Sequence, residues 1–145
     1  MKPLRLGDIL QELGYINAEQ ITAALAYQRE HRDLRLGQAL QKLGFVNERQ
    51  VLEALGRRLN LRIVDFSELT VDVSAVEKIP REVAQKYDML PIAQSGRTLT
   101  VAANDPLNYY AIEDIRQLTG MEPEIVLAEL EPLRRAIRYY YAEVS

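Results

Sequence analysis

The chain has 145 residues, about one domain's worth, and its 48% apolar and 27% charged content is ordinary for a globular protein. It has no cysteine and one histidine, His31, which excludes a disulfide scaffold, a thiol nucleophile and a cysteine or histidine metal cluster. No apolar run reaches the roughly 20 residues that span a bilayer, and no apolar stretch of a signal peptide follows the N-terminal lysine. We therefore expect a cytoplasmic protein.

Charge is distributed unevenly along the chain. Residues 1–60 carry nine basic and seven acidic side chains, a net of +2, whereas residues 61–145 carry nine and fourteen, a net of −5. The overall charge of −3 argues against non-specific binding of nucleic acid, which needs a basic face. The mildly basic first part is compatible with a small anionic ligand.

The first part contains an internal repeat. Residues 5–28 (RLGDILQELGYINAEQITAALAYQ) and 35–58 (RLGQALQKLGFVNERQVLEALGRR) align without a gap at an offset of 30 residues, with 11 of 24 positions identical. This indicates a true duplication. We expect a tandem-repeat helical subdomain at 1–60 and an α/β subdomain at 61–145.

Each repeat predicts a short helix, a turn and a longer helix. In the first copy, the apolar residues with helical spacing are Leu6, Ile9, Leu10 and Leu13. Gly14 should end the short helix, and Asn17 should cap the next helix in a capping box with Gln20. The second copy repeats these signals, which gives a four-helix unit.

The second part predicts strands and helices in alternation. A short strand is expected at 62–66, and three strands of one small sheet at 89–94, 98–103 and 124–128. Helices are expected at 74–77 with a Ser74–Glu77 capping box, from Pro80 to 87, at 109–119 between Asn108 and Gly120, and at 132–141. The predicted fold class is α+β: the four-helix unit, then a small three-stranded sheet with packed helices.

The sequence lacks the common motifs of nucleotide-binding, metal-dependent and serine-hydrolase active sites. There is no GxxxxGK[ST], GxGxxG, HExxH or GxSxG pattern, so we expect no catalytic residue and no metal. The acidic pairs, such as Glu113 with Asp114, are expected to be solvated surface, as is His31 in its charged turn. Tyr139–Tyr141 are expected to pack in the core and to form a docking edge for a neighbour.

The repeated RLGxxLxxxGxI…AL pattern resembles the MshEN domain, the N-terminal regulatory domain of type II secretion and type IV pilus assembly ATPases. The segments LRIVDF, IPREVAQKYDMLPIA, LTVAANDP and DIRQLTG also resemble that family, in the same order, so the resemblance covers essentially the whole chain. In that family, two tandem motifs bind one cyclic di-GMP. The resemblance implies a non-catalytic regulatory domain, with the ATP-hydrolysing domain elsewhere in the same protein or in a partner.

The resemblance and the repeat alignment together name the ligand-binding positions. In the first repeat they are Arg5, Leu6, Gly7, Leu10, Gly14, Leu25 and Gln28. In the second repeat they are Arg35, Leu36, Gly37, Leu40, Gly44, Leu55 and Arg58. No cofactor is expected besides the ligand cyclic di-GMP.

The chemistry of these residues agrees with such a ligand. Cyclic di-GMP is a two-fold symmetric dianion, so two near-identical half-sites match it. The arginines Arg5 and Arg35 can meet guanine edges or phosphate oxygens, and Gln28 offers both a donor and an acceptor to a guanine edge. The glycines Gly7 and Gly37 should allow the ligand close to the backbone, while the neighbouring leucines cover the ribose and the bases.

The sequence differs from the family pattern in two places. The second repeat ends in Arg58 where the family favours glutamine, and the spacer Arg29–Leu34 has six residues where five are expected. An arginine only donates, so we expect the half-site ending in Gln28 to be the better one and Arg58 to serve phosphate.

A second function is compatible with the same sequence. The domain could be a ligand-free docking module that contacts inner-membrane assembly proteins through its acidic second part or through Tyr139–Tyr141. The repeat glycines would then be helix caps and the leucines core. A DNA-binding helix pair is disfavoured by the negative charge, and we expect no insertion into a membrane.

Overall fold

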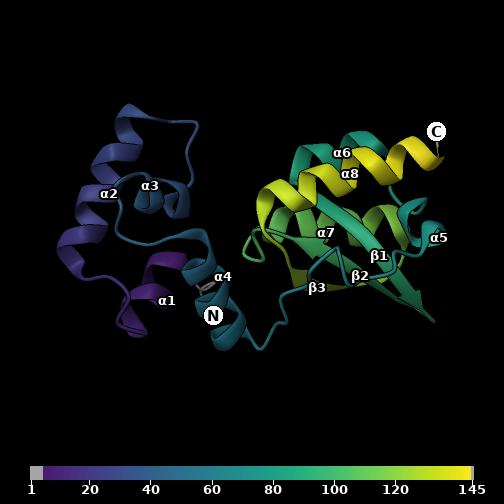
Figure 1. Cartoon of the computed structure of the whole chain (residues 1–145), viewed down its shortest axis with the longest axis horizontal. Helices are drawn as coiled ribbons and strands as arrows, with labels where there is room; N and C mark the ends of the chain where they lie inside the picture. Colours follow the sequence, from purple (N-terminus) through teal and green to yellow (C-terminus); the bar gives the residue numbers. More distant parts are fainter. Residues whose placement is uncertain (1–4, 145) are drawn as a thin grey trace. The chain divides into compact units, whose positions relative to one another are not determined.

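The computed structural model describes residues 5–144, which divide between Asn60 and Leu61 into two compact units (Figure 1). The first unit is helical, and the second combines a three-stranded sheet with helices. This is the α+β architecture that the sequence predicts. No helix within residues 5–144 is long and apolar enough to cross a bilayer.

The first unit consists of two helix pairs. Its helices are α1 (Leu6–Glu12), α2 (Ala18–Glu30), α3 (Leu36–Lys42) and α4 (Glu48–Leu59). The predicted capping box is present: the Gln20 N–H donates to Asn17 Oδ1 at 2.8 Å and the Asn17 N–H donates to Gln20 Oε1 at 2.9 Å. Asn47 and Gln50 repeat these bonds at the same distances, so both long helices begin alike.

The short helices end in matching turns. Gly14 has φ of 82° and Gly44 has φ of 78°, the left-handed conformation that glycine adopts without a steric cost. The following residues donate back into the helix, Tyr15 to the Leu10 carbonyl and Phe45 to the Leu40 carbonyl. This Schellman pattern confirms the predicted helix ends.

The two repeats are interlocked. Helix α1 packs against α4 and α2 packs against α3, so each short helix packs against the long helix of the other repeat, and α1 also contacts α3. The buried apolar residues of this unit are Ile9, Leu10, Ile16, Ala24, Ala39, Leu40, Val46, Val51, Leu52, Ala54 and Leu55. Because the core is shared in this way, neither repeat has a complete core of its own.

The second unit is built on a mixed sheet. Its elements are α5 (Val73–Val76), α6 (Arg81–Tyr87), β1 (Met89–Ser95), β2 (Thr98–Ala103), α7 (Tyr109–Thr119), β3 (Glu122–Leu127) and α8 (Leu130–Val144). Strands β1 and β2 form an antiparallel hairpin, and β3 pairs parallel to β2 after the crossover through α7. Helix α8 packs against α5, α6 and the first two strands, and lies beside α6 in Figure 1.

Four predictions for the second unit need correction, the first of them the final helix, which runs from Leu130 to Val144 rather than over 132–141. Residues 62–66 form no strand: Ile63 makes a single β-bridge to Leu127, flanked by two backbone hydrogen bonds. Helix α5 is capped by Asp72, whose Oδ1 accepts from the Ser74 N–H at 3.0 Å, so there is no Ser74–Glu77 capping box. Strand β3 begins two residues early because the Glu122 N–H already pairs with the Arg97 carbonyl.

Candidate ligand site on the tandem repeats

The arginines that open the two repeats occupy equivalent places. Arg5 and Arg35 are the N-cap residues of α1 and α3, both with extended backbone and exposed side chains. Their carbonyls accept the first helical hydrogen bonds, from the N–H groups of Ile9 and Ala39. Both guanidinium groups are therefore carried on the surface at the start of a short helix.

The residues after these arginines make a reciprocal contact. A Cβ placed on Gly37 would lie 2.9 Å from Leu6 Cδ2, and a Cβ on Gly7 would lie 3.2 Å from Leu36 Cδ2. Each leucine thus fills the space that the other repeat's glycine leaves open. This is the contact pattern of a two-fold interface, formed within one chain.

This contact gives a different explanation for why positions 7 and 37 are glycine. The sequence predicts that Gly7 and Gly37 leave room for a ligand, but both are buried and face a leucine side chain of the other repeat. Leu6 and Leu36 are half-buried, which leaves part of each side chain accessible. In this structure the missing side chains of the glycines allow α1 and α3 to approach closely.

The remaining apolar candidates differ in exposure. Leu10 and Leu40 are completely buried, and their side chains pack in the core of the unit. Leu25 is 44% exposed, whereas Leu55, at the same position of the second repeat, is 2% exposed. Gly14 and Gly44 are exposed at the helix ends described above. Of these residues, only Leu25 presents a large apolar surface to a ligand.

The residues that end the two repeats also differ. Gln28 is half-buried, and its Nε2 donates to the Leu34 carbonyl at 3.0 Å, which ties α2 to the segment before α3. Arg58 is exposed, and its Nε lies 3.5 Å from Glu12 Oε2 at the end of α1. A phosphate that binds Arg58 has to compete with this carboxylate.

A shallow hollow of about 500 Å³ lies at the end of the first repeat. It brings together two predicted residues, Leu25 and Gln28, with Leu34 and two further cations, Arg29 and Arg32. Neither cation is among the residues predicted from the sequence, because the spacer entered that prediction only through its length. The signal that could have identified them is their position directly after Gln28, a predicted ligand-binding residue, in the segment QREHR.

The histidine of the spacer is packed rather than solvated. The His31 ring stacks on Tyr27 with a centroid distance of 3.9 Å, and its Nδ1 lies 3.0 Å from the Tyr27 carbonyl oxygen. His31 does not line the hollow. Within residues 5–144 there is no group of three or more acidic or histidine side chains placed to hold a metal ion.

Comparisons with known proteins give the family. A family model described as the MshEN domain matches residues 59–145. The chain is 32% identical over 139 residues to the type IV pilus assembly ATPase PilB of Myxococcus xanthus (strain DK1622), which covers 96% of this chain and 24% of that protein. The chain thus spans about a quarter of that relative's length.

Solved structures extend the match to the repeats. The structure of MshE with cdg, the abbreviation for cyclic di-GMP, superposes with a TM-score of 0.83 at 35% identity and covers 95% of this chain and 99% of that chain. The N-terminal domain of XpsE shares the fold, with a TM-score of 0.71 at 21% identity, covering 92% of each chain. With the family match over more than half of its residues, the chain belongs to the MshEN domain family.

Proposed function

We propose that the chain is a non-catalytic regulatory domain of a pilus or secretion assembly ATPase, and that it binds one cyclic di-GMP across both repeats. The observation that carries this proposal is the reciprocal packing of the two Arg-Leu-Gly segments. It places Arg5 and Arg35 as the N-cap residues of two equivalent short helices within one unit. The likeness to MshE solved with this ligand supports the choice of nucleotide.

The symmetry of the ligand matches the reciprocal contact of the two Arg-Leu-Gly segments. Cyclic di-GMP carries two identical guanines and two phosphates around a two-fold axis, so Arg5 and Arg35 can make the same contact with its two halves. The exposed guanidinium groups of Arg5 and Arg35 can donate paired hydrogen bonds to guanine edges or phosphate oxygens, and the accessible parts of Leu6 and Leu36 provide apolar surface next to them in sequence. Leu10 and Leu40 support this surface from the core.

The first repeat offers the fuller half-site. The hollow beside Leu25 combines an apolar side chain, the Gln28 amide and the two spacer cations Arg29 and Arg32. The ligand would replace the hydrogen bond from Gln28 to the Leu34 carbonyl with bonds to a guanine edge. In the second repeat Leu55 is buried and Arg58 faces Glu12, so fewer groups are accessible there.

Regulation would follow from a population shift. A ligand that binds across both repeats stabilises their interlocked form and thereby changes how the domain engages its ATPase or its partners. ATP hydrolysis is assigned to another domain, because the chain has no P-loop motif. We assign the domain to the cytoplasm, where cyclic di-GMP is available.

The experiment is a calorimetric titration of the 145-residue chain with cyclic di-GMP, and in parallel with GMP, which presents half of the ligand. The proposal predicts saturable binding of cyclic di-GMP, a higher melting temperature, and much weaker binding of GMP. Absence of heat and of a thermal shift at millimolar cyclic di-GMP contradicts the proposal. ATP turnover by the purified chain above a buffer control would refute its non-catalytic part.

A further inference from the structure

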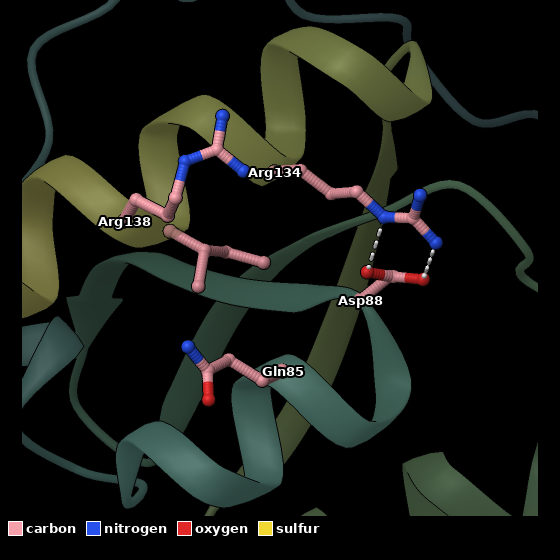
Figure 2. Close-up of a pocket in the computed structure, with 5 residues that line it drawn as sticks. Gln85, Asp88, Arg134 and Arg138 are labelled. Atoms are coloured by element: carbon pink, nitrogen blue, oxygen red, sulfur yellow. Dashed lines mark hydrogen bonds and ion pairs between the residues drawn. The ribbon is translucent and has the colours of Figure 1, made fainter.

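A pocket of about 280 Å³ lies in the second unit, between α6 and α8 (Figure 2). Its lining residues are Gln85, Asp88, Arg134, Ile137 and Arg138. None of them belongs to the repeats, and the proposed nucleotide site uses none of them. The pocket is smaller than the roughly 300–1,000 Å³ of sites for drug-sized ligands, so it fits a side chain better than a nucleotide.

One wall of the pocket is fixed by an ion pair. Arg134 Nε and Nη2 donate to Asp88 Oδ1 and Oδ2 at 3.0 and 3.1 Å, in the bidentate geometry drawn in Figure 2. Asp88 ends α6 in the left-handed conformation, with φ of 52°. The hydrogen bond to Asp88 raises the pKa of Arg134. Because Glu131 also lies 3.7 Å from Arg134, this guanidinium is already neutralised.

The other two polar side chains of the pocket are unpaired within the described part of the chain. In residues 5–144, the side chains of Arg138 and Gln85 make no hydrogen bond or ion pair, and Figure 2 draws no dashed line to either. Arg138 provides five N–H donors, and the Gln85 amide provides further donors and one acceptor. Ile137 also lines the pocket and is 2% exposed, so it belongs to the apolar floor rather than to the rim. A carboxylate on a short apolar stem matches this combination.

The outer face of α8 continues the pocket. Arg135, Arg138 and Tyr139 follow at helical spacing and are all exposed, Tyr139 to 59%. Tyr139 is held edge-on against the ring of Tyr140, with centroids 4.9 Å apart. Tyrosine and arginine are the residues that most often dominate the energy of protein interfaces. Tyr141, by contrast, is buried and donates to the Ile79 carbonyl, so it takes no part in this face.

The charge around this face selects its partner. Residues 61–145 carry a net charge of −5, so Arg135 and Arg138, about one turn apart on α8, form a positive area on an acidic unit. The carboxylates of Asp88 and Glu131 pair with Arg134. A polyanion such as nucleic acid would be repelled by the rest of the unit, whereas a short acidic peptide contacts only the positive area.

We propose that the α8 face, defined by Gln85, Arg135, Arg138 and Tyr139, docks an acidic segment of a partner protein, with one carboxylate of that segment in the pocket on Arg138 and Gln85. This surface acts independently of cyclic di-GMP. It also narrows the docking surface considered from the sequence, which was the acidic second part or Tyr139–Tyr141, to the α8 face.

The test is an NMR titration of the ¹⁵N-labelled chain with an acetylated hexaglutamate peptide. The expected result is a saturable shift of the Arg138 Nε–H and Gln85 amide signals, with affinity that falls as salt rises. Arg138→Gln should weaken binding at least tenfold. Arg97→Gln, which removes the same charge from an exposed site in the β1–β2 turn, is the matched control and should leave the affinity unchanged.

Other outcomes overturn the proposal. An absence of saturable shifts at Arg138 and Gln85 does so, as does equal weakening by Arg138→Gln and Arg97→Gln. Inorganic phosphate titrated alone and hexaglutamine serve as further probes. If phosphate shifts the same two signals with equal or higher affinity, the pocket is a simple anion site and the docking proposal is wrong. If hexaglutamine binds equally well, the carboxylate has no role.

Discussion

The two repeats share their local structure and differ in the surface they present. Both have a short helix ended by a left-handed glycine and a long helix opened by an asparagine–glutamine capping box. Yet Leu25 is 44% exposed where Leu55 is 2% exposed. The duplication has thus preserved the signals that begin and end the helices, whereas the packing around each copy decides which residues remain available for binding.

The largest expected difference concerns the paired leucines. Leu55→Ala should lower the free energy of unfolding of the helical unit by about 2–5 kcal/mol, because it removes a buried side chain and leaves a cavity. Leu25→Ala, the matched variant, should cost about 0.5 kcal/mol, as is usual for surface substitutions. Urea unfolding followed by circular dichroism measures both. Equal losses would mean that the two repeats are packed alike, contrary to the structure.

The two capping boxes should contribute equally to the stability of the helical unit. Asn17→Ala and Asn47→Ala each remove a side-chain acceptor for the N–H three residues on, so each should cost about 1 kcal/mol of stability. The same unfolding measurement applies. A difference of more than about 1 kcal/mol between the two variants would contradict the equivalence of the two boxes.

Much of the fold could be predicted because its signals are local. Gly14, Asn17 and Asn108 act on residues within one helical turn, and the structure confirms each of them. Residues 62–66 have strand-like composition, but a strand exists only where a partner pairs along its length, and here only Ile63 is bridged. A capping asparagine can thus be predicted from the residues next to it, whereas a strand forms only if a segment distant in the sequence pairs with it.

The candidate site was less predictable for the same reason. The motif locates Arg5 and Arg35, but nothing in the sequence states that Leu6 contacts Gly37, because that contact joins two helices of different repeats. Burial of Leu55 and exposure of Leu25 likewise depend on tertiary packing, since the two residues are identical and lie in similar helices. The reciprocal contact is therefore the main addition of the structure.

A smaller expected effect concerns the residues that end the repeats. Gln28→Ala should weaken binding of cyclic di-GMP by about 0.5–1.5 kcal/mol, the value of a neutral hydrogen bond, and Arg58→Ala should weaken it less. The reason is that Arg58 already faces Glu12. Calorimetry on both variants measures this, with unfolding curves to show that each remains folded. A larger loss from Arg58→Ala would reverse our assignment of the better half-site.

The smallest expected effect is on salt dependence. If Arg58 serves a phosphate, Arg58→Gln should reduce the decline of affinity between low and high salt, because one screened ionic contact is lost. Affinity at physiological salt should stay the same or improve. Arg57→Gln, one residue earlier and exposed, is the charge-matched control and should leave the salt dependence unchanged. An equal change in both variants would show a general charge effect.

If one cyclic di-GMP is shared by both repeats, the stoichiometry of its binding to Arg5→Ala and to Arg35→Ala will show it. We expect one ligand per chain in the parent protein and in both variants, with affinity lowered by about 1.5–3 kcal/mol in each, the value of a charge-assisted hydrogen bond. Two ligands per chain in the parent, with one lost and the other bound at unchanged affinity in each variant, would show independent sites and refute the shared site.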